Sequence, residues 1–250
     1  MSILLEHVSK SFGARTILED LSLEVRDGET VAVIGHSGVG KSVLLKSVVR
    51  LLEPEKGRVT VDGRNVAELT REELYELRRR VGYVFQFAAL FDSMTVYDNV
   101  AMGLRRIRDM GLAEIDQRVS ESLRLVEMTG FEDRMPGQLS GGQRKRVGLA
   151  RAIATKPKYL LYDEPTTGLD PVTTAVIDGL IQKMRNELKV TSVVVTHDMK
   201  SAYRIADRIA MLYKGRIRFV GTPAETQEAA DPIVRAFVEG RPELAQEVVA

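Results

Sequence analysis

The chain has 250 residues, and its 36 Lys and Arg residues nearly balance its 35 Asp and Glu residues, giving a formal net charge of +1. A chain this close to neutral lacks the positive field that holds nucleic acid by its phosphates, so we expect no nucleic-acid partner. It contains no cysteine, which excludes disulfides, thiolate nucleophiles and cysteine zinc sites. Glu6 and Lys10 come too early for a signal peptide, and no apolar run approaches the roughly 18 residues of a membrane helix. We therefore expect a soluble chain.

Three short apolar runs predict a parallel β-sheet that is buried on both faces. The first, Thr30–Ile34, ends at a glycine loop and is followed by apolar residues at helical spacing over Lys41–Leu52. The others, Tyr159–Tyr162 and Thr191–Val195, each deliver polar residues at their C-terminal ends. Asp170 and the proline after it are typical of a helix start, so we expect a crossover helix between these two strands.

Three dipeptides that contain glycine predict tight antiparallel hairpins, because each separates apolar or β-branched segments. They are Asp27-Gly28, Asp62-Gly63 and Lys214-Gly215. The stretch from about Phe87 to Pro157 lacks strong strand signals and contains helical patterns. One such pattern consists of Val119, Leu123, Val126 and Glu127. We therefore predict an α/β fold with a parallel core, an antiparallel β layer and an inserted α-helical subdomain.

Gly35 begins a pattern of glycine, four residues, glycine, lysine and serine that is typical of phosphate-binding loops. Its glycines let backbone N–H groups surround the β- and γ-phosphates of a nucleotide, at the N-terminus of the following helix. Lys41 adds a mobile positive charge, and the hydroxyl of Ser42 can bind Mg²⁺. The residues that we expect to bind the nucleotide here are Gly35, His36, Ser37, Gly38, Val39, Gly40, Lys41, Ser42 and Val43. The sequence thus predicts a P-loop NTPase (RecA-like) core that binds ATP and Mg²⁺.

Asp163 and Glu164 follow the apolar run Tyr159–Tyr162 and indicate hydrolysis. Because neighbouring strand residues point in opposite directions, we expect Asp163 to face Mg²⁺ and Glu164 to contact the attacking water. His197 follows the strand Thr191–Thr196, so a parallel topology brings it to the same sheet edge, where it can contact the γ-phosphate. The alternative for Asp163 and Glu164 is a carboxylate pair at the surface. The alternative for His197 is a packed or solvated histidine without a role in function.

A second anion site is predicted at Leu139–Gln143, where the sequence Leu-Ser-Gly-Gly-Gln opens a helix. Ser140 is a natural helix cap, and the glycines expose further N–H donors at the helix N-terminus. Taken alone, the string also fits an ordinary junction between a loop and a helix. Together with the phosphate loop it is far more specific.

With these motifs in this order, the chain resembles the ABC ATPase family over nearly its whole length. The resemblance implies that two copies pair head-to-tail as a homodimer through an isologous interface. Ser140, Gly141, Gly142 and Gln143 of one copy would then close over ATP that Gly35–Ser42 of the other copy holds. It also implies ATP hydrolysis coupled to an integral membrane permease.

The family pattern also assigns roles to residues outside these two motifs. Gln86 matches the sensor between nucleotide and permease, Gly168–Asp170 the loop that crosses the dimer interface, and Phe12 the position where similar ATPases stack adenine on a tyrosine. From the residues alone, Gln86 also fits a surface glutamine, Asp170 a helix cap and Phe12 core packing. The expected Mg²⁺ ligands are Ser42, Gln86 and Asp163. The expected catalytic residues are Glu164, His197 and Gln86.

Two strings, Gly38–Val43 and Phe85–Val100, resemble the ATPase of Mla/Mce-type lipid transport systems. This resemblance implies an MlaE-like permease, an Mce-domain lipid-binding protein and phospholipid movement between the bacterial inner and outer membranes, with the ATPase at the cytoplasmic side of the inner membrane. The apolar patch Phe87–Phe91 lies where similar proteins receive the permease, with core packing as the alternative. Asp231–Gly240 resembles a tail that packs against the neighbouring subunit in relatives, or it forms a frayed helix.

We expect a single ABC ATPase domain over residues 1–250. Its nucleotide-binding core would comprise residues 1–86 and 158–221, its helical subdomain residues 87–157 and its C-terminal tail residues 222–250. Two other functions stay open. An amino-acid, phosphonate or metal importer shares all the core motifs. A soluble ABC ATPase of DNA repair or translation usually carries coiled-coil insertions or duplicated cassettes, which this length does not accommodate.

Overall fold

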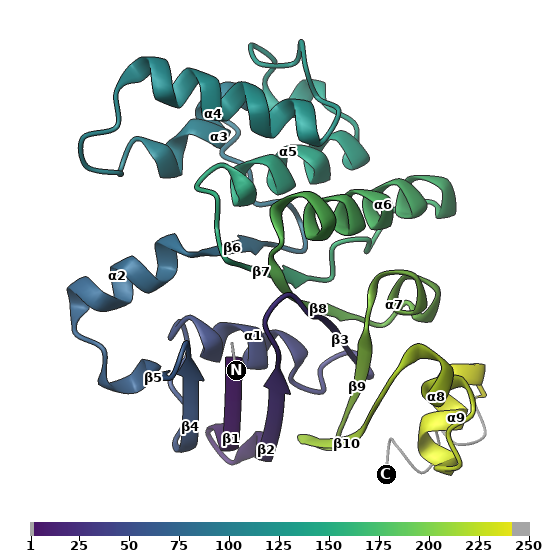
Figure 1. Ribbon diagram of the computed structural model, residues 1–250. Helices are drawn as coiled ribbons and strands as arrows, with labels where there is room; N and C mark the ends of the chain where they lie inside the picture. The colour runs from purple at the N-terminus through teal and green to yellow at the C-terminus, as the bar shows by residue number, and fades with distance from the viewer. Residues whose placement is uncertain (1–2, 242–250) are drawn as a thin grey trace. The chain divides into compact units, whose positions relative to one another are not determined.

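The structure, a computed structural model, describes residues 3–241 and divides into two compact units. Of the described residues, the first unit contains 3–69 and 193–241, and the second contains Thr70–Ser192. Figure 1 follows the chain from the N-terminal strands in purple to the C-terminal helices in yellow. The bounds predicted for the core, the helical subdomain and the tail stay a prediction.

An antiparallel sheet in the first unit has the strand order β2-β1-β4-β5. Its strands are β1 (Ile3–Phe12), β2 (Arg15–Val25), β4 (Lys56–Val61) and β5 (Arg64–Asn65), followed by a short 3-10 helix, η1 (Val66–Glu68). Ile3 lies opposite Val25 on one side and Val61 on the other, and all three are at most 2% exposed. The sheet therefore buries an apolar face, and the predicted antiparallel layer is confirmed.

A second group of strands in the first unit is built around β3 (Thr30–Ile34), which pairs parallel with β9 (Arg208–Tyr213). On the other side of β9, β10 (Arg216–Gly221) pairs antiparallel. Every residue of β3 is buried, as a parallel strand with both faces covered requires. This pairing confirms the predicted parallel core.

Two of the three predicted hairpins are confirmed. Asp62-Gly63 joins β4 to β5, and Lys214-Gly215 joins β9 to β10. The hairpin at Asp27-Gly28 is wrong, because β3 is apolar on both faces and pairs with β9 instead of returning along β2. The sequence patterns also miss a hairpin between β1 and β2, where Phe12 pairs with Arg15.

Helix α1 (Lys41–Val48) is shorter than the predicted Lys41–Leu52. Arg50 has a φ of 49°, which is incompatible with a continuing helix. Its guanidinium donates hydrogen bonds of 3.0, 3.1 and 2.9 Å to the carbonyls of Val66, Ala67 and Leu69. These partners are distant in sequence, so local spacing does not reveal where the helix ends.

The C-terminal part of the first unit contains α7 (Met199–Ile205), α8 (Pro223–Gln227) and α9 (Pro232–Glu239). Asp231 caps α9 and pairs with Arg218 of β10 at 3.0 Å. Val234 of α9 joins a buried cluster with Ile34 and Met211. A frayed helix, one alternative for this segment, does not describe α9.

In the second unit, β6 (Val81–Val84) pairs parallel with β7 (Tyr159–Asp163). α2 (Arg71–Arg79) precedes β6, and α6 (Pro171–Leu188) connects β7 to β8 (Thr191–Thr196) as the predicted crossover helix. β8 begins in this unit and ends in the first.

Helices occupy the chain between β6 and β7. They are α3 (Val96–Leu104), α4 (Leu112–Leu125), the short 3-10 helix η2 (Pro136–Gln138) and α5 (Gly141–Ile153). α3, α4 and α5 pack on one another (Figure 1), which confirms the helical insert. Val119 and Leu123 lie in α4 as predicted and are buried, whereas Val126 is the C-cap residue and Glu127, with a φ of 58°, lies beyond the helix. Within residues 3–241, no helix combines the length and the apolar content needed to cross a membrane.

Candidate functional site

The phosphate loop connects β3 to α1 in the first unit, and two of its glycines are also closely packed. Gly35 and Gly40 have φ values of 151° and 113°, which other residues rarely adopt. A Cβ at Gly35 would lie 2.4 Å from the carbonyl oxygen of Leu212. A Cβ at Gly40 would lie 2.9 Å from side-chain atoms of Ile17 and Leu18. The loop therefore packs too closely for side chains at either position.

Lys41 is held inside this loop and is 6% exposed. Its ammonium donates to the carbonyl oxygens of Gly35 at 2.7 Å and His36 at 3.1 Å. Ser42 and Val43 follow in the first turn of α1 and are half-buried. The loop thus places an ammonium, a hydroxyl and a helix N-terminus together, a donor set that fits the phosphates of a nucleotide.

His36 contacts the C-terminal helix α9. The rings of His36 and Phe237 form a T-shaped pair, with a centroid distance of 5.0 Å and an interplanar angle of 89°. Burial and the positive charge of Lys41 lower the pKa of His36, which favours its neutral form. The sequence patterns do not reveal Phe237, because nothing near it in the chain points to the loop.

A cavity of about 220 Å³ lies beside the loop in the first unit. Its lining comprises Arg15–Ile17 of β2, His36–Val39 of the loop and Tyr213–Gly215 of the β9–β10 hairpin. Phe12, at the end of β1, is 49% exposed, and the Lys10 ammonium lies 5.5 Å from its ring centroid. Core packing does not describe a ring this exposed, so Phe12 has a face open for stacking.

His197 directly follows β8, as predicted, and is exposed. The next residue, Asp198, caps α7 by accepting hydrogen bonds from the amides of Lys200 and Ser201 at 2.9 and 3.3 Å. The cap fixes the turn that carries His197. A packed histidine, one of the alternatives, does not describe this side chain.

In the second unit, Asp163 and Glu164 are 7% and 9% exposed, so they are not a surface pair. Asp163 ends β7, and its Oδ2 accepts a hydrogen bond from the Tyr83 hydroxyl at 3.2 Å. Burial and this carboxylate raise the pKa of Tyr83, so the hydroxyl stays a donor. Glu164 lies outside the strand with a φ of 50°, and its Oε2 accepts from the Thr167 hydroxyl at 3.1 Å. We predicted opposite directions for Asp163 and Glu164 because both were expected in the strand. That reason is wrong, because Glu164 lies outside β7, and its left-handed backbone sets the direction of its side chain.

Gln86 follows β6, and its backbone carbonyl accepts a hydrogen bond from the ammonium of Lys145. In the apolar patch, Phe87 is 81% and Phe91 is 48% exposed, whereas Ala88 is 2% exposed. Core packing thus accounts for Ala88 but not for the two rings. The patch presents aromatic side chains on the surface of this unit and anchors them through a buried alanine.

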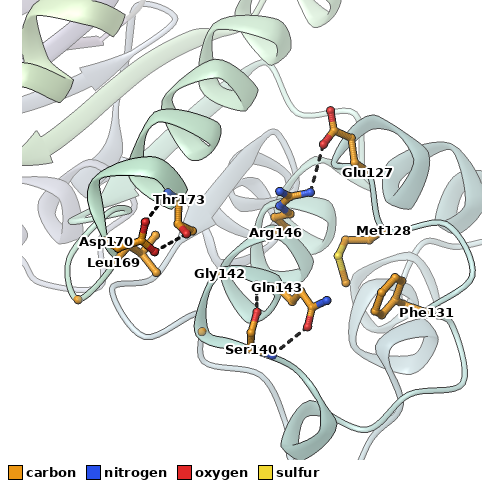
Figure 2. A pocket seen from close by; sticks show the side chains of 12 residues that line it. Glu127, Met128, Phe131, Ser140, Gly142, Gln143, Arg146, Leu169, Asp170 and Thr173 are labelled. Carbon is orange, nitrogen blue, oxygen red and sulfur yellow. Dashed lines mark hydrogen bonds and ion pairs between the residues drawn. The ribbon is translucent and has the colours of Figure 1, made fainter.

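A cavity of about 470 Å³ in the second unit lies at the N-termini of α5 and α6 (Figure 2). Ser140 Oγ accepts from the Gln143 amide at 3.3 Å, and Gln143 Oε1 accepts from the Ser140 amide at 2.9 Å, so Ser140 is a cap as predicted. Asp170 caps α6 by accepting from the amides of Val172 and Thr173 at 2.9 and 3.0 Å. Two helix N-termini therefore meet at one cavity, and the Asp170 carboxylate offsets the positive end of α6.

The two helices approach closely because Gly142 has no side chain. A Cβ there would lie 2.6 Å from Thr173 Cγ2. The cavity lining includes both Ser140–Gln143 and Gly168–Asp170, two strings that lie far apart in sequence. The structure thus brings together two of the predicted site segments.

Other walls of this cavity carry no sequence motif. Arg146 of α5 pairs with Glu127 at 3.1 Å, and Met128 and Phe131 complete the side formed by the loop after α4 (Figure 2). Lys145 is likewise absent from the predicted site. One signal in the sequence could have identified Lys145: it lies on the buried face of α5, where a charged residue is unusual.

Comparisons with known proteins agree with this geometry. A family model described as ABC transporter matches residues 18–167. The chain is 41% identical to the probable ribonucleotide transport ATP-binding protein mkl of Mycobacterium leprae, over 96% of this chain and 70% of that protein. It is 43% identical to the sulfate/thiosulfate import ATP-binding protein CysA of Thermosynechococcus vestitus, over 95% and 69%. A dimeric post-hydrolysis structure of the ATP-binding cassette MJ0796 bound to ADP and Pi aligns with a TM-score of 0.81 at 34% identity, over 88% of this chain and 98% of that one.

Proposed function

Because this chain belongs to the ABC transporter family and is an ATP-binding, ATP-hydrolysing subunit of a transporter, we propose that it works as a homodimer that drives a permease in phospholipid transport. The cavity lined by Ser140–Gln143 and Gly168–Asp170 carries the dimer proposal. It has the positive end of α5, whose first turn carries no acidic residue, while Asp170 offsets that of α6, and none of the phosphate-loop residues line it. Such a site fits the γ-phosphate of ATP held by a second copy.

In the proposed dimer, each ATP is shared between two copies. Gly35–Val43 of one copy hold the phosphates, where Lys41 exchanges its two loop carbonyls for phosphate oxygens, and Ser140–Gln143 of the other copy close over them. Phe12, with its exposed ring, stacks on adenine. An isologous two-fold interface produces two equivalent sites. The dimeric state named for the MJ0796 structure supports this arrangement.

Glu164 is proposed to activate the attacking water, with His197 contacting the γ-phosphate and Gln86 reporting to the permease. The burial of Glu164 and its hydrogen bond from Thr167 support a fixed, functional carboxylate. Removing a group that acts only in the transition state lowers kcat without abolishing ATP binding.

Ser42, Gln86 and Asp163 are the residues that would hold Mg²⁺. Hydroxyl, amide and carboxylate oxygens are ligand types that this ion prefers, and the hydrogen bond from Tyr83 orients the Asp163 carboxylate. When bound, Mg²⁺ neutralises charge on the phosphates. Chelation of Mg²⁺ is therefore expected to stop hydrolysis.

Phospholipid transport of the Mla/Mce type is supported by Gly38–Val43 and Phe85–Val100, the strings that resemble such ATPases. The exposed rings of Phe87 and Phe91 provide a surface for an MlaE-like permease. With an Mce-domain lipid-binding protein, the complex would move lipid between the inner and outer membranes, and this chain would lie at the cytoplasmic side of the inner membrane.

A second candidate is the ATPase of a solute importer. The similarity to CysA, which is named for sulfate/thiosulfate import, favours this candidate at a comparable level of identity. The mkl protein carries a third substrate name, ribonucleotide, so the names of the relatives do not agree on one cargo.

Glu164→Gln tests the ATPase proposal. This variant should bind ATP, hydrolyse it far more slowly and accumulate as a dimer in chromatography with ATP. Glu187→Gln on the exposed face of α6 is the matched control and should behave as wild type. Unchanged turnover in Glu164→Gln would refute the assigned role.

Copurification tests the cargo. The chain is expressed with its neighbouring genes, and the copurifying permease and lipids are identified by mass spectrometry. An Mce-domain protein with bound phospholipid supports the lipid proposal. A periplasmic solute-binding protein in its place supports the importer and overturns it.

A further inference from the structure

Lys145 is a buried charge that the proposed mechanism leaves without a role. It is 7% exposed, and its ammonium donates to the backbone carbonyls of Gln86 and Glu164, the latter at 3.4 Å. Burial lowers the pKa of Lys145, while the nearby charge of Glu164 favours its charged form. An ammonium this buried is retained only where oxygens replace the water that it loses. One side chain thus binds the backbone of two residues to which the proposed function gives roles.

The backbone at Glu164 depends on such support. Its φ of 50° is a conformation that residues other than glycine rarely adopt. Its carbonyl also accepts a hydrogen bond from the Thr167 amide at 3.3 Å, and its carboxylate accepts one from the Thr167 hydroxyl. Lys145 therefore holds the peptide that follows Glu164, while Thr167 holds the carboxylate.

The segment after Gln86 depends on the same helix. Ala88 and Ala89 have φ values of 59° and 49°, and two such residues in succession need external support. The guanidinium of Arg151 donates to both of their carbonyls, at 2.7 Å for Ala89. Gly148 lets α5 come this close, because a Cβ there would lie 3.2 Å from Ala88 Cβ. Lys145, Gly148 and Arg151 recur every third residue and form one contact face of α5.

We propose that Lys145 is a positioning residue that ties the chain at Gln86 to the backbone of Glu164. A displacement of the apolar patch would then reach the hydrolytic carboxylate through the contact face of α5, the helix that begins with the anion-binding Ser140–Gln143. This inference rests on the proposed roles of Gln86 and Glu164. Lys145 acts through their carbonyl groups and is not itself a catalytic residue.

Lys145→Met tests the inference, because it keeps the length and apolar stem of the side chain and removes the ammonium. In the full chain, kcat for ATP hydrolysis is expected to fall about tenfold while KM for ATP changes less than about twofold. Lys145→Arg still offers donors to both carbonyls and should recover most of kcat. Lys156→Met is the control, since Lys156 has a 59% exposed side chain and pairs with Glu121 at the surface. It should retain wild-type kcat and KM.

A double variant distinguishes positioning from a general structural effect. If Lys145 acts through Glu164, Lys145→Met slows the Glu164→Gln enzyme no further in single-turnover hydrolysis. Equal slowing in both backgrounds, or wild-type kcat in Lys145→Met, would overturn the inference.

If Lys145→Met does not fold, Gly148→Ala replaces it, because its new Cβ presses on Ala88 without removing a charge. The same selective loss of kcat is expected, and its absence counts against the inference. Wild-type turnover in Glu164→Gln alone would instead refute the proposed function, so the two failures are distinguishable.

Discussion

Replacing Phe237 by alanine tests how far α9 supports the phosphate loop. Phe237 is partly buried, packs against the cluster that contains Ile34 and Met211, and forms a T-shaped pair with the His36 ring. A fully buried Phe→Ala change costs about 3–5 kcal/mol, so partial burial predicts about 2 kcal/mol. The lost contact between the two rings adds about 0.5–1 kcal/mol. We therefore expect Phe237→Ala to lower the free energy of unfolding by about 2–3 kcal/mol in urea denaturation.

The same variant has a second consequence, for the titration of His36. Burial is the main cause of its lowered pKa, so removing the Phe237 ring should raise the pKa toward its ordinary value. Between the lowered pKa and the ordinary one, the unfolded chain binds more protons than the folded chain. This residue's contribution to stability therefore falls as the pH drops through that window. The drop should be smaller in Phe237→Ala.

NMR titration of the His36 ring protons measures the pKa of this residue and the ring-current shift that Phe237 causes. Val238→Ala is the control, since Val238 packs against the same cluster in the same helix. It should destabilise the protein without moving the pKa of His36. The reasoning is wrong if Phe237→Ala leaves the His36 pKa and its ring-current shift unchanged, because the two rings would then not be in contact in solution.

Three further predictions use other features of the structure. Gly40→Ala should destabilise the chain by about 2–4 kcal/mol in urea denaturation and prevent ATP binding. Alanine is strained at the positive φ of this residue, and its Cβ would lie 2.9 Å from side-chain atoms of Ile17 and Leu18. Gly179→Ala on α6, where nothing lies within 4 Å, should instead stabilise it by about 0.5–1 kcal/mol, and equal losses would contradict the steric argument. Phe87→Ser should abolish copurification of the permease, whereas Leu112→Ser, at a 77% exposed residue of α4, should preserve it. If both variants still copurify with the permease, the permease contact lies elsewhere. Ser140→Ala should cost about 1 kcal/mol and weaken ATP-dependent dimerisation, and a dimer of wild-type affinity would exclude this cap from the interface.

Local chemistry made parts of the site predictable from sequence. The caps at Ser140 and Asp170 form hydrogen bonds within three residues, so their spacing in the chain already contains the interaction. The phosphate loop is similar, because its glycines carry the backbone geometry in their own identity. The buried run Tyr159–Tyr162 likewise predicts a strand by composition alone.

Long-range contacts account for what the sequence did not predict. The end of α1 depends on carbonyls after β5 that bind Arg50, and the Asp27-Gly28 turn depends on which strand becomes the neighbour of β3. The partners of Lys145 are likewise set by packing, because Gln86 lies 59 residues and Glu164 lies 19 residues away. The position of Lys145 on the buried face of α5 indicates an unusual charge, but no local pattern identifies the partner in any of these contacts.

Because α5 is one continuous helix, a shift at one of its contacts also moves the others. Its 13 residues span about 20 Å, with Lys145 about 6 Å from the first residue and about 9 Å from Arg151. A tilt about the first residue of the helix that shifts Arg151 by about 1 Å would shift Lys145 by about 0.4 Å in the same direction. Hydrogen bonds weaken over a few tenths of an ångström. In the proposed mechanism, a displacement of this size at the apolar patch would therefore be enough to change the hydrogen bond from Lys145 to the Glu164 carbonyl.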